Sequence, residues 1–144
     1  MKKALVLCGG MPQIALIEEL KSRGIETILL DMNEKVKARE YADKFYPVSV
    51  LDVDAVREVA KKEKVDYILT VCADQVLLVV AQLCEELGLP WYIDYQTAKN
   101  VSDKAYMKRI FSENGIPTSK YAVSDEFDPH IADGMEYPLI VKPV

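Results

Sequence analysis

The sequence predicts an α/β fold in which a parallel β-sheet carries helices on both faces. Short apolar runs of strand length alternate along the chain with longer segments whose apolar residues recur at helical spacing. Glycine and proline stand between many of these segments, as turns require. Strands that alternate with helices form βαβ units, so we expect the sheet to be parallel.

The first buried strand is predicted over Ala4–Cys8, an unbroken apolar run that ends at two glycines. The following helix has Pro12 in its first turn and ends at Arg23 and Gly24. Further along, the same alternation predicts four more strands, over Thr27–Leu30, Phe45–Val48, Tyr67–Val71 and Trp91–Ile93. Between them it predicts helices over Lys35–Tyr41 and Gln75–Leu87, the second with Asp74 as its cap. A further helix between these two is expected to begin at a cap formed by Asp52 or Asp54.

The alternation changes near residue 95. Two successive helices are predicted over Tyr95–Val101 and Ser102–Asn114, the second with Ser102 as its cap. Strands are expected over Ser119–Val123 and Leu139–Lys142, with an acidic, irregular segment between them. We therefore expect one domain over residues 1–97 and the start of a second over 98–144.

Composition excludes several classes of protein. Of the 144 residues, 50% are hydrophobic and 28% are charged, which is typical of a globular chain rather than a disordered one. The net charge of −5 argues against a nucleic-acid surface, which needs a clustered basic face. No apolar run is long enough to span a membrane or to serve as a signal peptide. Three cysteines without Cys-x-x-Cys spacing favour a reducing compartment, so we expect a cytoplasmic protein.

Candidate ligand-binding residues follow the predicted strands. In an open parallel sheet, ligands bind at the carboxyl ends of the strands. Gly9 and Gly10, Asp31, and Asp74 stand at these positions, and we interpret them as substrate-binding residues. The two glycines would let a ligand approach the backbone at a helix N-terminus, where an anion is favoured. The alternative interpretation is that they only form the tight turn between strand and helix.

A dinucleotide fingerprint is only partly present. Asp31 lies 21 residues beyond Gly10, where an acid that binds a ribose would stand. The glycines do not fit the Gly-x-Gly-x-x-Gly pattern in either alignment, because Cys8 and Gln13, or Met11 and Ile14, occupy the required positions. Gln13 would also crowd the helix–strand contact that the third glycine permits. The pattern therefore disfavours NAD.

The cysteines and the single histidine point to no metal site or catalytic triad. Cys8 and Cys72 stand near the carboxyl ends of predicted strands and could be neighbours, but His130 lies far along the chain. Buried cysteines are usually small apolar fillers, and we interpret Cys8, Cys72 and Cys84 in this way. No metal ligands are therefore predicted.

Two lysines are candidates for binding phosphate. Lys104 stands in the first turn of a predicted helix, where backbone N–H groups favour anions. Lys142 ends an apolar predicted strand, a position that is unfavourable unless the ammonium reaches solvent or an anion. The alternatives are a solvated helix face for Lys104 and Lys108 and protection of a sheet edge for Lys142.

These residues resemble a known family, the ATP-grasp ligases, and most closely the group of carbamoyl phosphate synthetase large subunits, biotin carboxylase, D-alanine–D-alanine ligase and formate-dependent glycinamide ribonucleotide transformylase. Three segments carry the resemblance in matching order: the N-terminal run from Lys3 through Asp31-Met32-Asn33 to Ala42–Tyr46, then Ser102–Lys108 with Asn114–Thr118, and finally Tyr137–Pro143. The last two are the more specific. The resemblance implies a Rossmann-like pre-ATP-grasp domain followed by the incomplete start of an ATP-grasp domain.

The resemblance also implies a reaction. Such enzymes transfer the γ-phosphate of ATP to a carboxylate, and an amine or another nucleophile attacks the acyl phosphate. Lys104 and Lys142 would contact ATP, and the Gly9-Gly10 turn would line the acceptor pocket. The partners would be a small carboxylate and a nucleophile. A homodimer is possible because members of the family often pair through this region, and the oligomeric state stays open at this stage.

The family's glycine-rich loop and its Mg²⁺ ligands would lie beyond Val144, so we expect this chain alone to be inactive. Two other functions remain open at this stage. One is a non-catalytic regulatory module that binds NAD or another nucleotide, and the other is a structural or dimerisation domain.

Overall fold

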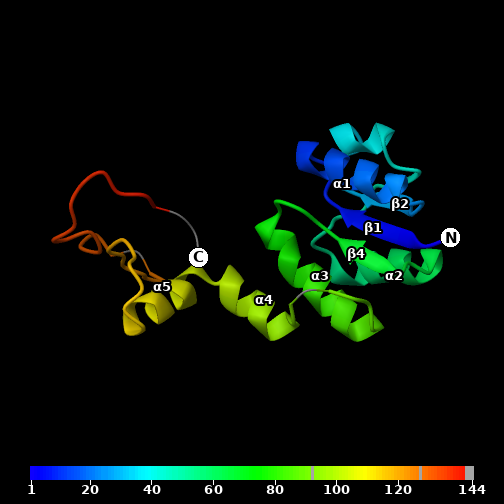
Figure 1. Ribbon diagram of the computed structural model, residues 1–144. Coiled ribbons are helices and arrows are strands. Elements are labelled where there is room, and N and C mark those ends of the chain that lie inside the picture. The colour runs from blue at the N-terminus through cyan, green and yellow to red at the C-terminus, as the bar shows by residue number, and fades with distance from the viewer. Residues whose placement is uncertain (92, 127, 142–144) are drawn as a thin grey trace. The chain divides into compact units, whose positions relative to one another are not determined.

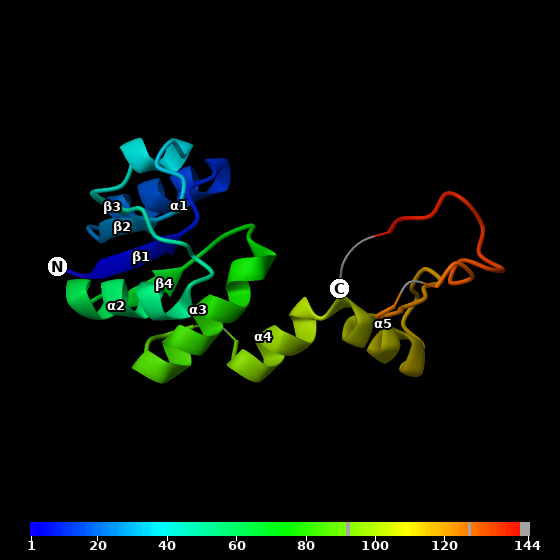
Figure 2. The ribbon, with the colours of Figure 1, turned by 180° about the vertical axis from the view of Figure 1, so that it is seen from behind.

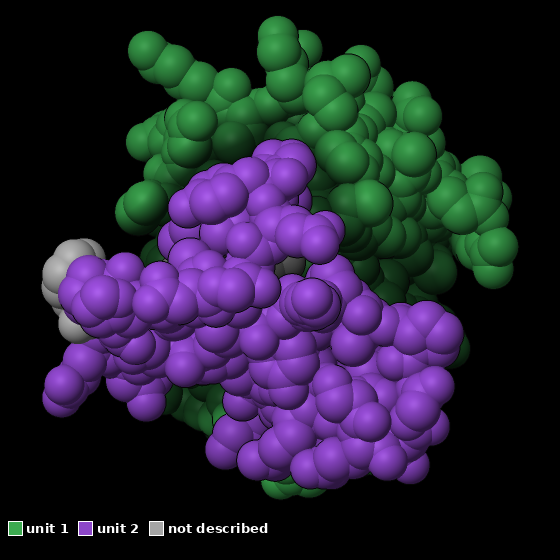
Figure 3. Space-filling model, turned by 90° about the vertical axis from the view of Figure 1, so that its left-hand side faces the viewer, with its two compact units in different colours: residues 1–98 green, residues 99–144 purple. Residues whose placement is uncertain are grey.

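The computed structural model describes residues 1–91, 93–126 and 128–141. By its internal contacts the chain divides into two compact units, Met1–Ala98 and Lys99–Val144, which Figure 3 shows in separate colours. The first unit contains a sheet and its covering helices.

A four-stranded sheet forms the centre of the first unit, with the strand order β3-β2-β1-β4. Every neighbouring pair is parallel, as the sequence predicts. The strands are β1 (Lys3–Leu7), β2 (Glu26–Leu30), β3 (Lys44–Tyr46) and β4 (Tyr67–Leu69). In the register of the central pair, Leu5 lies opposite Ile28. A fifth strand was expected over Trp91–Ile93, but Trp91 and Ile93 are not in a strand, and Tyr92 lies outside the described residues.

Helices cover both faces of this sheet (Figures 1 and 2). Helix α1 (Met11–Ser22) and the short 3₁₀ helix η1 (Lys37–Glu40) lie on one side, and α2 (Val53–Glu63) and α3 (Asp74–Leu87) lie on the other. The two hydrophobic clusters follow the alternation of β1. Leu5 and Leu7 pack toward α2 and α3, whereas Ala4 and Val6 pack toward α1. This alternation explains why the run Ala4–Leu7 is apolar throughout, since side chains on both faces are buried.

The helix ends follow local capping rules. Asp52, one of the two predicted caps of α2, accepts a hydrogen bond from the Ala55 N–H at 3.1 Å. Helix α1 begins directly after Gly10, and the chain turns after it at Gly24, whose φ is 71°. The prediction that Asp74 caps α3 is wrong. Asp74 is the first residue of the helix itself, Ala73 is the N-cap, and no side chain caps this end.

Several elements are shorter than the sequence suggests. The predicted helix over Lys35–Tyr41 is a single 3₁₀ turn, and β4 ends at Leu69 rather than Val71. Strand β3 ends before Pro47, because proline has no N–H with which to continue the ladder.

Beyond the sheet, the chain forms α4 (Tyr95–Ser102) and α5 (Lys104–Glu113). The cap of α5 is Asp103, which accepts a hydrogen bond from the Tyr106 N–H at 2.8 Å. The prediction that Ser102 is the cap is therefore wrong, because Ser102 still belongs to α4.

The strands expected in the second unit are not seen in the residues that the structure describes. Ser119–Val123 is irregular, as are residues 139–141, while Lys142 lies outside the described residues. From Lys99 onward no described residue is buried. A stable strand needs a hydrogen-bonded neighbouring strand and an apolar face that is buried against other residues. The described part of this unit provides neither of these.

Candidate functional site

The candidate site lies at the carboxyl ends of β1 and β2, where the two strand ends are joined by hydrogen bonds. The Cys8 N–H donates to the Leu30 carbonyl at 3.0 Å. The carboxylate of Asp31 accepts from the Gly9 N–H through Oδ2 and from the Asn33 N–H through Oδ1, each at 2.8 Å. Both oxygens of Asp31 are thus engaged by backbone, and this side chain fixes the relative position of the two turns.

Gly9 and Gly10 differ in what their surroundings require. A Cβ built on Gly9 would lie 2.2 Å from Cγ2 of Val36, so the close approach of Val36 excludes any side chain at this position. Gly10 is the N-cap of α1 and has an ordinary φ of −71°, and no side chain caps this helix start. The first N–H groups of α1 therefore receive no hydrogen-bond acceptor from a capping side chain. They lie at the carboxyl edge of the sheet, because α1 begins directly after the turn that follows β1.

Gln13 has a role that the sequence interpretation missed. Its side chain is only 3% exposed, and its Nε2 donates to the Val71 carbonyl at 2.7 Å. This hydrogen bond ties α1 to the turn after β4. The sequence does contain an indication of this role, because Gln13 recurs at helical spacing with the apolar residues Ile17 and Leu20 and therefore lies on the buried face of α1.

A depression of about 450 Å³ opens at the carboxyl ends of the strands. It is lined by Cys8, Val50, Leu51, Cys72, Ala73, Asp74, Gln75 and Val76. The structure therefore brings Asp74 and two of the cysteines together in one hollow. Gly9, Gly10 and Asp31 lie in the adjoining turns and are not part of this lining.

The lining of this depression is apolar and acidic. Asp74 is the one charged residue among the side chains that line it in the described part of the chain. Lysine, arginine and histidine are absent from the same lining, so any anion bound in the hollow would rely on backbone N–H groups.

The three cysteines have different environments. Cys84 lies in the core of the first unit at 1% exposure, and burial raises the pKa of its thiol to about 11. Burial and the neighbouring Asp31 carboxylate also raise the pKa of Cys8, so this half-buried group is a thiol at neutral pH. Cys72 is exposed. The interpretation as an apolar filler describes Cys84 but is wrong for Cys72.

Of Lys104, Lys108 and Lys142, the three lysines considered as phosphate-binding or solvated residues, the first two differ in their surroundings. Lys104 is the half-buried first residue of α5. Lys108, expected on a solvated helix face, instead donates from Nζ to Thr118 Oγ1 at 2.6 Å and to Ser119 Oγ at 2.7 Å. It therefore holds the segment after α5 and has a structural role. Lys142 lies outside the described residues.

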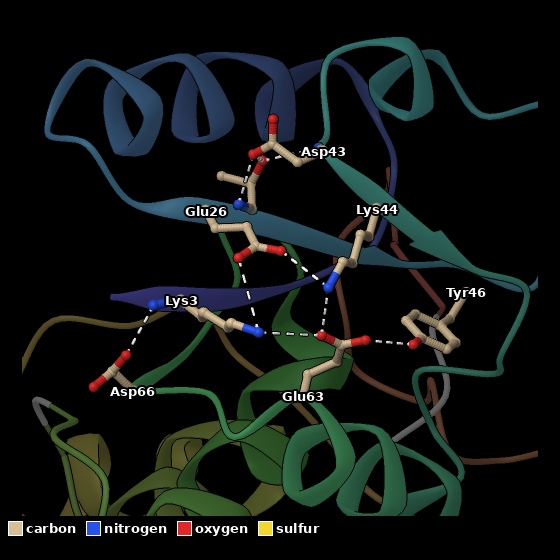
Figure 4. Close-up of polar contacts among 8 residues, drawn as sticks. Lys3, Glu26, Asp43, Lys44, Tyr46, Glu63 and Asp66 are labelled. Carbon is tan, nitrogen blue, oxygen red and sulfur yellow. Dashed lines mark hydrogen bonds and ion pairs between the residues drawn. The ribbon is translucent and has the colours of Figure 1, made fainter. Parts of the chain in front are cut away.

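A cluster of charges occupies the opposite, amino edge of the sheet (Figure 4). Glu63, at the end of α2, contacts Lys44 Nζ at 2.8 Å and Lys3 Nζ at 3.5 Å. The Tyr46 hydroxyl donates to the same carboxylate at 2.5 Å. The hydrogen bonds from Lys44 and Tyr46 lower the pKa of Glu63 to about 2. Glu26 contacts both lysines, so the cluster joins three strands to α2.

The described residues contain neither a metal-binding cluster of three or more ligands nor a membrane-spanning helix. Among those residues, His, Cys, Asp and Glu do not gather in a group of three or more that could hold a metal ion. Within the same residues, no helix has both the length and the apolar character needed to cross a bilayer.

Comparison with known proteins identifies the family. The model of the ATP-grasp N-terminal domain matches residues 17–91, more than half of the chain. The chain belongs to this family. The match begins within α1 and includes β2, β3, β4, α2 and α3. The predicted family and its parallel α/β fold are thereby confirmed.

Relatives of this family give the chain its context. A formate-dependent phosphoribosylglycinamide formyltransferase of Hydrogenovibrio crunogenus is 32% identical over 97% of this chain. A phosphoribosylglycinamide synthetase of Anaerococcus prevotii has a similar structure, with a TM-score of 0.71 and 26% identity over 87% of this chain and 32% of its own. The biotin carboxylase domain dimer of Hydrogenobacter thermophilus 2-oxoglutarate carboxylase shares the fold, with a TM-score of 0.70 and 23% identity over 95% of this chain and 33% of its own.

The length of the match is limited on the relatives' side. The chain spans 36% of the length of the Hydrogenovibrio formyltransferase and of a second one from Parabacteroides distasonis, which is 33% identical over 97% of this chain.

Proposed function

We propose that this chain forms the N-terminal part of an ATP-dependent ligase, which activates a carboxylate as an acyl phosphate for attack by an amine or a related nucleophile. The observation that carries the proposal is the position of the depression, at the carboxyl edge of the sheet of an ATP-grasp N-terminal domain. Ligands of open parallel sheets bind at this edge.

The acceptor substrate would bind at this edge. The start of α1 after Gly10 would present the uncapped N–H groups of Met11 and Gln13 to an anionic group of the substrate, whereas the space beside Gly9 is occupied by Val36. Asp31 would act as a positioning residue, since both its oxygens hold backbone N–H groups. Asp74, which lines the depression, is the group that could meet an ammonium on the nucleophile.

Lys104 and Lys142 would contact the nucleotide. Lys104 fits this role because it opens α5, where the helix N-terminus favours a phosphate. A lysine ammonium acts on phosphate as a mobile point charge. ATP would supply the phosphoryl group that makes the carboxylate reactive.

Magnesium, which such a ligase would use, is not assigned to residues of this chain. In the described part of the chain, His, Cys, Asp and Glu do not gather in a group of three or more that could hold a metal ion. At phosphoryl-transfer sites, Mg²⁺ is commonly held by one or two carboxylates together with the phosphates of the nucleotide.

The test uses the full-length protein that contains this chain. Replacing Lys104 or Lys142 by alanine is expected to weaken ATP affinity at least about tenfold, the loss of one charge-assisted phosphate contact. Lys120→Ala is the matched control, because Lys120 is exposed and lies in the same unit. Calorimetric titration with ATP measures the affinity, and thermal unfolding shows that each variant is folded.

Two outcomes would contradict the proposal. If both variants bind ATP as the control does, the lysines are not nucleotide contacts. If the protein binds NAD or another nucleotide without any carboxylate-dependent release of ADP, the chain is part of a non-catalytic binding module.

The 144-residue chain by itself is expected to release no ADP from ATP. Phosphoryl transfer depends on accurate positioning of the reacting groups and on neutralisation of the phosphate charge. No described residue of the second unit is buried, so the described part of this unit has no packed core that would hold such groups in place. Steady ATP turnover by the purified chain would contradict this expectation.

We also propose that the protein pairs as a homodimer. Support comes from the Hydrogenobacter domain of similar fold, which is described as a dimer. Sedimentation of the full-length protein at micromolar concentration tests this, and a single species of monomer mass would contradict it.

A further inference from the structure

The depression at the carboxyl edge contains two thiols that the proposed reaction does not use. Cys8 follows β1 and Cys72 follows β4, and both line the hollow. Cys72 is exposed and Cys8 is half-buried, so an oxidant in solution reaches Cys72 more readily than Cys8. The third cysteine, Cys84, is in the core and is not among the residues that line this depression.

The pairing of the strands brings together the two turns that carry these thiols. β1 and β4 are hydrogen-bonded neighbours with Val6 opposite Leu69, and neighbouring strands lie about 4.8 Å apart. One residue further on, the Thr70 hydroxyl donates to the Leu7 carbonyl at 3.0 Å, so the two chains remain adjacent past the end of the ladder. Cys8 comes next after Leu7, and Cys72 is two residues after Thr70.

The turns that carry the thiols are also held in place. Gln13 binds the Val71 carbonyl, and Asp31 binds the N–H of Gly9. Cys8 and Cys72 have φ values of 73° and 52°, in the left-handed region that residues with a side chain rarely adopt. Each cysteine thus stands in a fixed turn at the rim of the same hollow.

We propose that Cys8 and Cys72 form a redox site, at which a hydroperoxide converts the two thiols into an intramolecular disulfide across the depression. The inference does not rest on the ligase function. A bridge needs Cα atoms about 4.4–6.8 Å apart. Continuing the register of β1 and β4 places Cys72 one residue beyond the position opposite Cys8, and an offset of about 3.3 Å between strands about 4.8 Å apart stays within that range. The bridge would join the turn after β1 to the turn after β4 and would change the shape of the candidate acceptor site.

The chemistry proceeds in two balanced steps. The Cys72 thiolate attacks one oxygen of the peroxide, so that an S–O bond forms, the O–O bond breaks and water leaves after protonation. The Cys8 sulfur then attacks Cys72 Sγ, the S–S bond forms, and the oxygen leaves as a second water. The two thiols lose two electrons and two protons in total, and one hydrogen peroxide becomes two waters.

The test treats the purified 144-residue chain with hydrogen peroxide and measures its intact mass and its free thiols without reductant. The wild-type chain is expected to lose two hydrogens and to retain one of its three thiols. Peptide mapping should show Cys8 joined to Cys72. Cys84→Ser is the matched control and should still form the bridge, whereas Cys8→Ser and Cys72→Ser should not.

A sample oxidised in denaturing urea checks that the folded turns direct the pairing. There, the preference for the Cys8–Cys72 bridge over bridges to Cys84 should disappear. Three outcomes would overturn the proposal: a folded chain that keeps all three thiols, a dimer linked through Cys72, and oxygen adducts on Cys72 without a bridge. Circular dichroism of each variant establishes that it is folded, so a missing bridge in a folded wild-type chain counts against the redox site.

Discussion

At Gly9 the neighbouring side chain determines which residue can occupy the position. A Cβ there would stand 2.2 Å from Val36 Cγ2 and 2.6 Å from Val36 Cβ, and neither atom belongs to a flexible chain end. The Gly9→Ala variant is therefore expected to lose about 1–3 kcal/mol of unfolding free energy, as overpacked sites do. Urea denaturation followed by circular dichroism measures this loss.

Two further variants check the reason for that loss. Gly10→Ala adds the same methyl group where its nearest contact is Gln13 Oε1 at 3.1 Å, and it should cost less than about 1 kcal/mol. The double variant Gly9→Ala/Val36→Ala should be destabilised by less than the sum of the two single changes, because Val36→Ala removes the clash. Strict additivity of the two changes would refute this explanation.

For Gln13, the sequence predicts the position of the side chain but not its hydrogen-bond partner. The helical spacing places Gln13 on the apolar face of α1, and from this position we predicted that its side chain would crowd the contact between helix and strand. Its hydrogen-bond partner could not be predicted, because Val71 is 58 residues away and no local pattern links the two. The glycines, Asp31 and Asp74 were placed at the carboxyl edge correctly, because strand ends can be located from apolar runs.

The buried amide of Gln13 is expected to stabilise the first unit. Gln13→Leu keeps a similar volume but leaves the Val71 carbonyl without its donor, so about 1–3 kcal/mol of unfolding free energy should be lost. Gln82→Leu is a suitable comparison, since Gln82 lies in α3 and makes none of the hydrogen bonds described here. Equal stabilities of the two variants in urea denaturation would contradict the role assigned to Gln13.

At the scale of elements, the start of α2 was left open by its sequence, because Asp52 and Asp54 are both good caps. The structure selects Asp52, whose carboxylate accepts from the Ala55 N–H. Asp52→Ala is expected to cost about 1 kcal/mol, and Asp52→Asn, which retains a capping oxygen, should cost much less. Thermal or urea unfolding compares the two, and an Asn variant as unstable as the Ala variant would argue against capping.

The elements of the second unit could be predicted only in part. Helices α4 and α5 were expected almost as they occur, since helices depend largely on local spacing and caps. The strands expected at Ser119–Val123 and near Leu139 were not found in the described residues, because a strand is defined by a partner. Apolar runs alone do not supply that partner.

At the scale of the whole first unit, the charged cluster at the amino edge makes stability depend on pH. Lys44 and Tyr46 lower the pKa of Glu63 from 4.5 to about 2, so the folded state favours the ionised carboxylate. The contribution of Glu63 is therefore fully present above about pH 4.5 and is lost as the pH falls toward 2. The sequence alone did not indicate this cluster, since its members come from three strands and one helix.

Glu63→Gln tests the cluster directly. The variant should be less stable than the wild type at neutral pH, and the difference should shrink as the pH falls from 4.5 to 2. Glu58→Gln, a change in the same helix outside the cluster, should show no such convergence. Urea denaturation at a series of pH values measures both, and a difference that stays constant across this range would contradict the assignment.

The most direct test of the ligase proposal is to trap the activated carboxylate. The full-length protein is incubated with ATP, magnesium, a panel of small carboxylates and hydroxylamine, which converts acyl phosphates into stable hydroxamates. We expect ADP and a hydroxamate in equal amounts with one class of carboxylate, and neither product without ATP. Binding of a nucleotide by folded protein, with no ADP and no hydroxamate from any carboxylate in the panel, would contradict the ligase function and favour a binding module.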